Sequence, residues 1–130
     1  MTAPLIHHVT LTVTDVARSA EWYQRLLGPA ASVERQGPSW ERLRMQWPSG
    51  LVIGVTRHDT TGDGAFDCTA VGLDHLGLGC SSADEVRAWK DRLEELDMDH
   101  GLLEEVAYGW AVTARDPDGI AIEFFCPAAA

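Results

Sequence analysis

The sequence predicts an α+β protein made of two tandem βαβββ modules whose sheets curl around a shared cavity. Three observations lead to this prediction: an internal repeat at an offset of 67 residues, a strand followed by a helix at the start of each half, and three short extended segments after each helix. Such a repeat indicates that one supersecondary unit has been duplicated, and it constrains the fold before any single element is considered.

The repeat is clearest at five pairs of identical residues. These pairs are His8 with His75, Leu11 with Leu78, Trp22 with Trp89, Arg25 with Arg92 and Leu26 with Leu93. Near the end of each half the match resumes two residues later, with Gly50 on Gly119. Counted from these glycines, Gly54 corresponds to Glu123. Only the second half therefore carries a carboxylate at this position.

The first module is predicted over residues 6–58. Residues 6–13 alternate between apolar and polar, which is typical of a strand with one packed face and one face toward a cavity. A helix is expected over 16–27, because Asp15 can cap its start and Gly28 can end it. Its expected apolar stripe is Val16, Ala20, Tyr23 and Leu27. Strands are expected at 33–35, 40–47 and 51–57, with a turn at 48–50 between the last two.

A polar linker is predicted at 59–70 and the second module at 71–126, all within one domain of 1–130. A strand at 73–80 places His75, Gly77 and Gly79 on one face. Residues 82–85 have the pattern of a capping box, in which Ser82 and Glu85 satisfy helix amides reciprocally, and the helix continues to about residue 96. Strands follow at 102–106, 109–114 and 120–125, with a turn at 116–119 before the last.

Composition narrows the function classes. A net charge of −10 disfavours nucleic acid and anionic membrane surfaces as partners, and no apolar run reaches membrane-spanning length. Three widely spaced cysteines fit reduced thiols, with Cys80 and Cys126 expected to be buried near strand ends. The start of the chain lacks the pattern of a secretory signal. We therefore expect a cytoplasmic protein that acts on a small molecule.

The alternation of the strands predicts a metal site. His8 lies with Thr10 and Thr12 on the polar face of the first strand, and Glu123 lies opposite the apolar face of the last strand. An interior carboxylate is costly unless it is paired or bound to a cation. We predict that His8, His75 and Glu123 bind a divalent metal ion, with Fe, Mn, Ni, Co and Zn all open. The alternative is that these groups only form hydrogen bonds inside a closed barrel.

The other histidines are expected to have structural or solvated roles. Alternation sends His7 to the helix side of its strand, and His58 and His100 fall in predicted loops. Four residues are weaker candidates for the substrate pocket, where core packing is an equal alternative for the aromatic ones: Thr10, Trp40, Tyr108 and Trp110. The catalytic residues are unknown, because no side chain can be assigned as the general base.

The chain resembles the vicinal oxygen chelate superfamily, which contains glyoxalases, bleomycin-resistance proteins and extradiol dioxygenases. The resemblance rests on residues 8–15, His-Val-Thr-Leu-Thr-Val-Thr-Asp, on 22–28, Trp-Tyr-Gln-Arg-Leu-Leu-Gly, and on 116–123, Asp-Pro-Asp-Gly-Ile-Ala-Ile-Glu. It implies a metal-dependent enzyme whose small substrate chelates the metal through adjacent oxygens. It also implies a homodimer with sites shared between chains.

Departures from the family patterns favour some activities over others. Glyoxalase I and the methylmalonyl-CoA epimerase have a fourth ligand, where this chain has Gly54. Three ligands are the pattern of extradiol dioxygenases and fosfomycin-resistance enzymes, and Thr10 matches a substrate-contacting threonine of the latter. The segment 108–115 lacks the phosphonate contacts of that family. Dioxygenase, glyoxalase, lyase and transferase activities stay open, and so does non-catalytic sequestration of an antibiotic.

Overall fold

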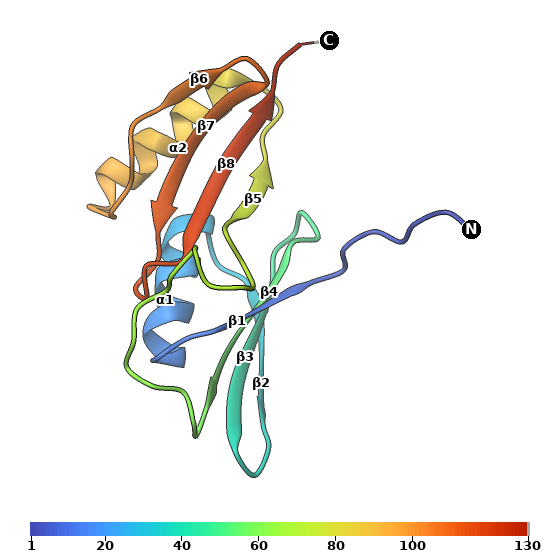
Figure 1. Cartoon of the computed structure of the whole chain (residues 1–130), viewed down its shortest axis with the longest axis vertical. Helices are drawn as coiled ribbons and strands as arrows, with labels where there is room; N and C mark the ends of the chain where they lie inside the picture. The colour runs from blue at the N-terminus through green and yellow to red at the C-terminus, as the bar shows by residue number, and fades with distance from the viewer. Residues whose placement is uncertain (130) are drawn as a thin grey trace. The chain divides into compact units, whose positions relative to one another are not determined.

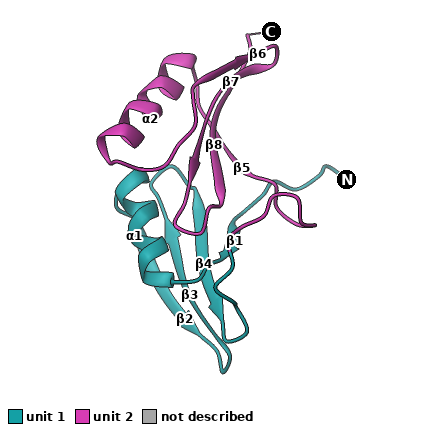
Figure 2. Ribbon diagram, turned by 60° about the vertical axis from the view of Figure 1, so that its left-hand side comes forward, with its two compact units in different colours: residues 1–64 teal, residues 65–130 magenta. Residues whose placement is uncertain are grey.

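The computed structural model describes residues 1–129 and divides the chain into two compact units, Met1–Gly64 and Ala65–Ala130 (Figure 2). Each unit contains one four-stranded sheet and one helix that packs against it (Figure 1). The α+β class and the duplicated βαβββ order predicted from the sequence are confirmed.

The first unit contains β1 (Val9–Thr12), α1 (Val16–Leu27), β2 (Ala31–Gln36), β3 (Trp40–Gln46) and β4 (Val52–His58). Its sheet has the order β1-β4-β3-β2, with β1 parallel to β4 and the other pairs antiparallel. A parallel first strand requires a crossover connection, and α1 supplies part of it. The helix covers one face of this sheet, and within the unit the other face has no helix over it.

The second unit contains β5 (Leu76–Gly79), α2 (Ala83–Glu95), β6 (Glu104–Val106), β7 (Gly109–Arg115) and β8 (Ala121–Pro127). Its sheet has the order β5-β8-β7-β6, with the same parallel and antiparallel pairs as the first. In the first unit Thr10 pairs with Gly54, and in the second Gly77 pairs with Glu123. The correspondence of Gly54 with Glu123 in the sequence is therefore also a correspondence in sheet register.

The helix starts follow their capping residues. The Asp15 side chain accepts a hydrogen bond from the Arg18 amide at 2.9 Å, and α1 ends at Gly28 with φ of 94°, a conformation that favours glycine. The Ser82 hydroxyl accepts from the Glu85 amide at 3.1 Å, as predicted. The Glu85 carboxylate accepts from the amide and hydroxyl of Ser81. The reciprocal half of the predicted capping box is thus displaced by one residue.

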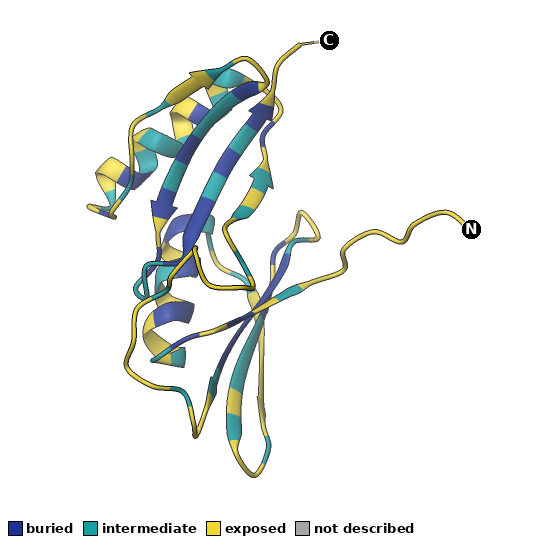
Figure 3. Cartoon of the chain, viewed as in Figure 1, coloured by how far each residue is buried: buried dark blue, intermediate teal, exposed yellow. Residues whose placement is uncertain are grey.

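Each core lies between a sheet and its helix (Figure 3). In the first unit α1 buries Ser19, Ala20, Tyr23 and Leu26 against the sheet. The predicted stripe was wrong at its ends, because Val16 and Leu27 are only half-buried while Leu26 is buried. In the second unit the ring of Trp89 stacks on Phe124 with 4.6 Å between centroids, which joins α2 to β8.

The first strand of each unit is shorter at its start than the sequence pattern predicted, whereas the strand predicted at 33–35 is longer and is β2, Ala31–Gln36. The strand predicted at 6–13 is β1, Val9–Thr12, and the strand predicted at 73–80 is β5, Leu76–Gly79. His8 and His75 therefore each lie immediately before the first strand of their unit. His58, predicted in a loop, is the last residue of β4. Among residues 1–129 no helix has both the length and the apolar character needed to cross a membrane.

Candidate metal centre

The alternation of β8 places Glu123 on the sheet face opposite α2. Its neighbours Ile122 and Phe124 are 0% and 2% exposed and pack on the helix side, whereas the Glu123 side chain retains 25% exposure. Glu123 pairs across the sheet with Gly77 on one side and Thr113 on the other. A Cβ added at Gly77 would lie 3.8 Å from Glu123 Oε1, so the glycine leaves space beside the carboxylate.

His75 and Glu123 come together in the second unit. The Nε2 atom of His75 lies 3.9 Å from Glu123 Oε1, and its Nδ1 lies 2.7 Å from an oxygen of Asp74. In the neutral tautomer that donates from Nδ1 to Asp74, the free lone pair is on Nε2, the ring nitrogen near the Glu123 carboxylate. Two acceptors that face each other suit a cation between them, and a carboxylate on the second nitrogen is the usual support of a metal-binding histidine.

His8 has a parallel arrangement in the first unit. Its Nδ1 lies 2.9 Å from Nδ1 of His7, and His7 is the counterpart of Asp74 at the 67-residue offset. If His8 donates this hydrogen bond, its Nε2 is free to bind a ligand. The residue before each predicted histidine ligand therefore contacts the same ring nitrogen. This relation was missed in the sequence, where alternation predicted that His7 and His8 point to opposite faces.

His75 and Glu123 fit two ligands of one metal ion. Adjacent ligands of one ion with bonds of about 2.1 Å lie about 3 Å apart, so the 3.9 Å between Nε2 and Oε1 requires only a small side-chain adjustment. Within residues 1–129 no group of three or more His, Cys, Asp or Glu side chains is assembled for a metal. His75 and Glu123 form a pair in one unit, and His8 belongs to the other.

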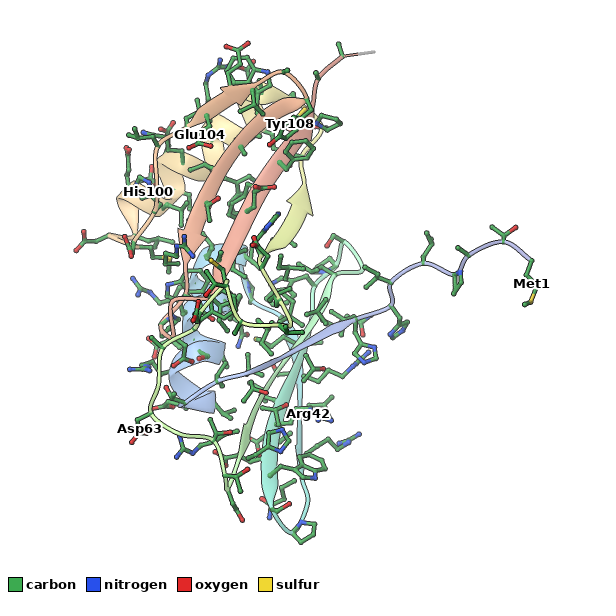
Figure 4. The ribbon with its side chains drawn as sticks, in the orientation of Figure 1. Met1, Arg42, Asp63, His100, Glu104 and Tyr108 are labelled. Carbon is green, nitrogen blue, oxygen red and sulfur yellow. The ribbon has the colours of Figure 1, made fainter. Side chains whose placement is uncertain are left out.

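The four weaker pocket candidates occupy different positions. Thr10 is exposed on the open face of β1, and Tyr108 is 71% exposed in the turn before β7, 6.2 Å from the ring of Phe125 (Figure 4). Trp40 is the first residue of β3, and the guanidinium of Arg42 lies 4.7 Å from the centre of its ring. Trp110 pairs with the buried Cys126 and lies under Arg87 of α2, on the face away from Glu123. This placement favours a packing role for Trp110.

The cysteines behave as the composition predicted within the described residues. All three are free. Cys80 is buried immediately after β5, and Cys126 is buried in β8. Burial, followed by the nearby charge of Glu85, raises the pKa of the Cys80 thiol to about 11. This thiol is protonated at neutral pH and is therefore a poor metal ligand or nucleophile.

A hollow of about 990 Å³ in the first unit lies between α1 and the strands β2 and β3. Its walls include Ala20 and Gln24 of the helix and Leu43 of β3, and none of the predicted metal ligands lines it. It lies on the helix side of the sheet, and we assign it no part in the metal chemistry.

Comparison with known proteins identifies the family. The model of the Glyoxalase/Bleomycin resistance protein/Dioxygenase superfamily matches residues 5–124. The chain belongs to this superfamily. A search of curated proteins found no match. The chain is 31% identical to a glyoxylase/bleomycin resistance protein/dioxygenase domain from Frankia sp. EAN1pec, whose crystal structure aligns over 98% of this chain and 100% of that one with a TM-score of 0.89.

More distant members of the superfamily share the fold. The genomically encoded fosfomycin resistance protein FosX from Listeria monocytogenes is 19% identical over 98% of this chain and 94% of its own, with a TM-score of 0.74. A mutant of FosX has been crystallised with Mn(II) and 1S,2S-dihydroxypropylphosphonic acid, and it aligns at 17% identity over 98% of this chain and 95% of its own with a TM-score of 0.70. At these identities the likeness establishes the fold alone.

Proposed function

We propose that this superfamily member is a metal-dependent enzyme whose small substrate binds the metal through two adjacent oxygens. The ligands we propose are His8, His75 and Glu123. The observation that carries the proposal is the facing pair of Nε2 and Oε1 at 3.9 Å, with Nδ1 of His75 held by Asp74. The Mn(II) complex of FosX supports it, because that relative combines the same fold with a divalent metal and a vicinal diol.

The bound metal would act as a Lewis acid that stabilises negative charge on a substrate oxygen. The chain supplies the conditions for this chemistry. The Asp74 carboxylate at Nδ1 would hold the ring of His75 with Nε2 free for the metal, and Gly77 keeps space beside Glu123 for a substrate. The counterpart of Glu123 in the first unit is Gly54, which has no side chain to bind a metal. The proposed centre therefore has three protein ligands, one fewer than in four-ligand members of the superfamily. More positions therefore stay open for a bidentate substrate and a second small molecule.

The direct test is metal content after substitution. We expect His8→Ala, His75→Ala and Glu123→Gln each to lower the bound metal per chain sharply, measured by elemental analysis after anaerobic purification. His58→Ala and His100→Ala are controls, because these histidines lie at the end of β4 and beside β7. Equal metal content in all five variants would contradict the ligand assignment.

Open coordination positions on the proposed metal favour dioxygenase or group-transfer chemistry over isomerisation. The assay is a panel of catechols, epoxides and thiol adducts of 2-oxoaldehydes, with Fe(II), Mn(II), Ni(II) or Zn(II), with and without oxygen. Oxygen uptake coupled to catechol loss supports the dioxygenase, and turnover of epoxides supports the transferase. Oxygen-independent turnover of the 2-oxoaldehyde adducts would reverse this preference. Tight stoichiometric binding of bleomycin without turnover of any substrate would indicate a sequestering protein.

We further propose a homodimer in which His8 of one chain and His75 with Glu123 of the other complete each centre. Mixing His8→Ala chains with Glu123→Gln chains should then regenerate some native centres and restore metal binding in the heterodimer. A monomer in sedimentation, or no recovery after verified subunit exchange, would contradict the shared arrangement.

A further inference from the structure

Three arginines lie on the open face of the first sheet. The register gives one row across the sheet of Thr12, Thr56, Arg42 and Arg35, and a neighbouring row of Thr10, Gly54, Arg44 and Val33. Both rows lie opposite the face that holds Leu11, Ile53 and Met45, which are at most 5% exposed and pack beneath α1. Figure 4 labels Arg42 on β3.

Two of these arginines occupy directly opposed positions of the sheet. Arg35 and Arg42 are cross-strand partners in the β2–β3 pair, and like charges in this position destabilise a sheet. Carboxylates do not relieve the repulsion, because among residues 1–129 none of the three arginines lies in an ion pair. Acidic residues outnumber basic ones by 20 to 10 in this chain, so the absence of a carboxylate partner is a specific feature of this face.

The contacts of the three arginines are to neutral groups. Arg42 Nε donates to the Thr56 hydroxyl at 2.7 Å, and its guanidinium lies over the Trp40 ring. Arg44 contacts the Gln46 side-chain oxygen at 3.5 Å, and Arg35 contacts the backbone oxygen of Glu34 at 3.0 Å. These contacts orient the side chains while most of their N–H groups stay available, and no charge is neutralised.

A hydroxyl donor lies in the same row as Arg44. Gly54 stands between Arg44 and Thr10 in the sheet, and the Thr10 side chain lies over it, since a Cβ on Gly54 would be 3.1 Å from the Thr10 hydroxyl. His8 lies in the same unit, two residues before Thr10 and immediately before β1. Guanidinium groups bind carboxylates and phosphates through two parallel hydrogen bonds, so this face offers positive charge and hydrogen-bond donors together.

We propose that the open face of the first sheet is an oxyanion subsite, in which Arg42 and Arg44 bind a carboxylate or phosphoryl group and Arg35 adds charge. The inference that this anionic group belongs to the substrate of the metal centre rests on the function proposed above. The anion site itself does not, since its residues all lie in the first unit.

The test is binding of inorganic phosphate and of acetate to the full chain after removal of metal by chelation, followed through the arginine Nε–H signals in ¹⁵N NMR. We expect Arg42→Gln and Arg44→Gln each to weaken phosphate binding about tenfold or more. Arg42→Lys should recover only part of it, because lysine keeps the charge and loses the planar pair of donors. Tighter binding of phosphate than of acetate would assign the phosphoryl group, and the reverse order the carboxylate.

Arg87→Gln is the matched control. Arg87 also lies over a tryptophan, Trp110, but on the helix side of the other unit and paired with Asp84. This variant should bind phosphate as the native chain does. Equal phosphate binding by native, Arg42→Gln and Arg44→Gln chains would overturn the subsite, as would tighter binding of a single-stranded oligonucleotide through the same arginines.

Failure of the subsite and failure of the metal proposal are distinguishable with Glu123→Gln. This variant should lose metal but keep phosphate binding with the same dependence on Arg42 and Arg44. Loss of phosphate binding in Glu123→Gln would place the anion at the metal ligands and overturn the separate subsite. Native metal content in Glu123→Gln, with phosphate binding still dependent on the arginines, would overturn the metal assignment and leave the subsite standing.

Discussion

At the scale of single residues, the contacts at Nδ1 of the two predicted histidine ligands decide which nitrogen can bind a metal. Asp74 contacts His75 and His7 contacts His8, at 2.7 and 2.9 Å, and the two pairs occupy equivalent positions of the repeat. A carboxylate is a stronger partner for an imidazole N–H than a second imidazole is. The two halves therefore support their histidines unequally.

We expect Asp74→Ala to weaken divalent-metal binding by about tenfold to a hundredfold, since loss of such a supporting group frees the ring and its tautomer. His7→Ala should weaken it less, and His7→Asp should strengthen it by giving the first unit the carboxylate of the second. The measurement is the dissociation constant by competition with a chelator. Identical constants for native, Asp74→Ala and His7→Asp chains would refute the supporting role.

The inward position of Glu123 could be predicted from the sequence because β8 is a regular strand with strict alternation. The contacts of His7 and Asp74 could not. Alternation holds only inside a paired strand, and both residues lie before one, since β1 begins at Val9 and β5 at Leu76. The arginines of β3 were also missed, although Arg42 and Arg44 are spaced by two residues and share a face with Trp40. That spacing was a usable signal.

At the scale of the elements, the helix starts were predictable, whereas the starts of β1, β2, β5 and β6 were predicted two or three residues away from their observed positions. Asp15 and Gly28 placed α1 at its observed bounds, because caps act through local hydrogen bonds and backbone conformation. A strand extends only as far as a partner pairs with it, and the partner is distant in sequence. The strand predicted at 102–106 is therefore only Glu104–Val106, the part that pairs with Gly109–Ala111.

The Glu85 carboxylate at the start of α2 should make the free energy of unfolding fall at acid pH. Hydrogen bonds from the Ser81 amide and hydroxyl hold the pKa of Glu85 below its ordinary value. A carboxyl whose pKa is lowered by folding contributes stability above its unfolded pKa and loses it as pH falls through the folded one. The difference in unfolding free energy between native and Glu85→Gln chains should thus be constant from about pH 6 to 8 and shrink below about pH 4.5. Chemical denaturation across this range measures it, and a difference that persists unchanged at pH 3 would contradict it.

Gly109, the first residue of β7, should not accept a side chain without loss of stability. A Cβ on Gly109 would overlap the backbone oxygen of Cys126 and come within 2.8 Å of the Phe125 ring. The strand pair cannot open there without loss of its register, so we expect Gly109→Ala to lower the unfolding free energy by about 2 kcal/mol. Gly119→Ala is the comparison, since φ there is 82° but no atom lies near its added Cβ. A smaller loss for Gly109→Ala than for Gly119→Ala would show that overlap is not the main cost.

At the scale of the whole molecule, duplication explains most of what the sequence could predict. One repeat fixed the number of modules, the order of elements and the equivalence of Gly54 with Glu123. Net charge was a poorer guide. A value of −10 describes the average surface and gives no sign of a local gathering of arginines on one sheet face. That arrangement depends on which strands become neighbours.

The pair Thr10 and Gly54 in the first unit is equivalent to the pair Gly77 and Glu123 in the second. This equivalence can be tested by giving the first pair the residues of the second. The Thr10→Gly and Gly54→Glu double variant gives the first unit the glycine and glutamate that the second has at 77 and 123. Removal of Thr10 is needed because a Cβ at position 54 would lie 3.1 Å from its hydroxyl. We expect about tenfold tighter binding of divalent metal through the added carboxylate ligand. Phosphate binding should weaken, because the new carboxylate lies beside Arg44.

Thr10→Gly with Gly54→Gln is the control for this double variant, since it adds the same bulk without charge. Metal affinity no higher in the glutamate variant than in the glutamine variant would show that position 54 cannot serve as a ligand position. Calorimetric titration with Mn(II) and with phosphate reads out both effects on the same samples.

The single difference between Gly54 and Glu123 also bears on how such a protein diversifies. If one module assembled as identical copies, any mutation would appear at every equivalent position, and the number of ligands could change only in pairs. Joining two modules in one chain lets each position mutate alone. With the ligands proposed above, a three-ligand centre is therefore one or two codon changes away from a four-ligand centre. Tandem duplication leaves this position free to vary, so the chemistry of the proposed centre can change while the fold stays the same.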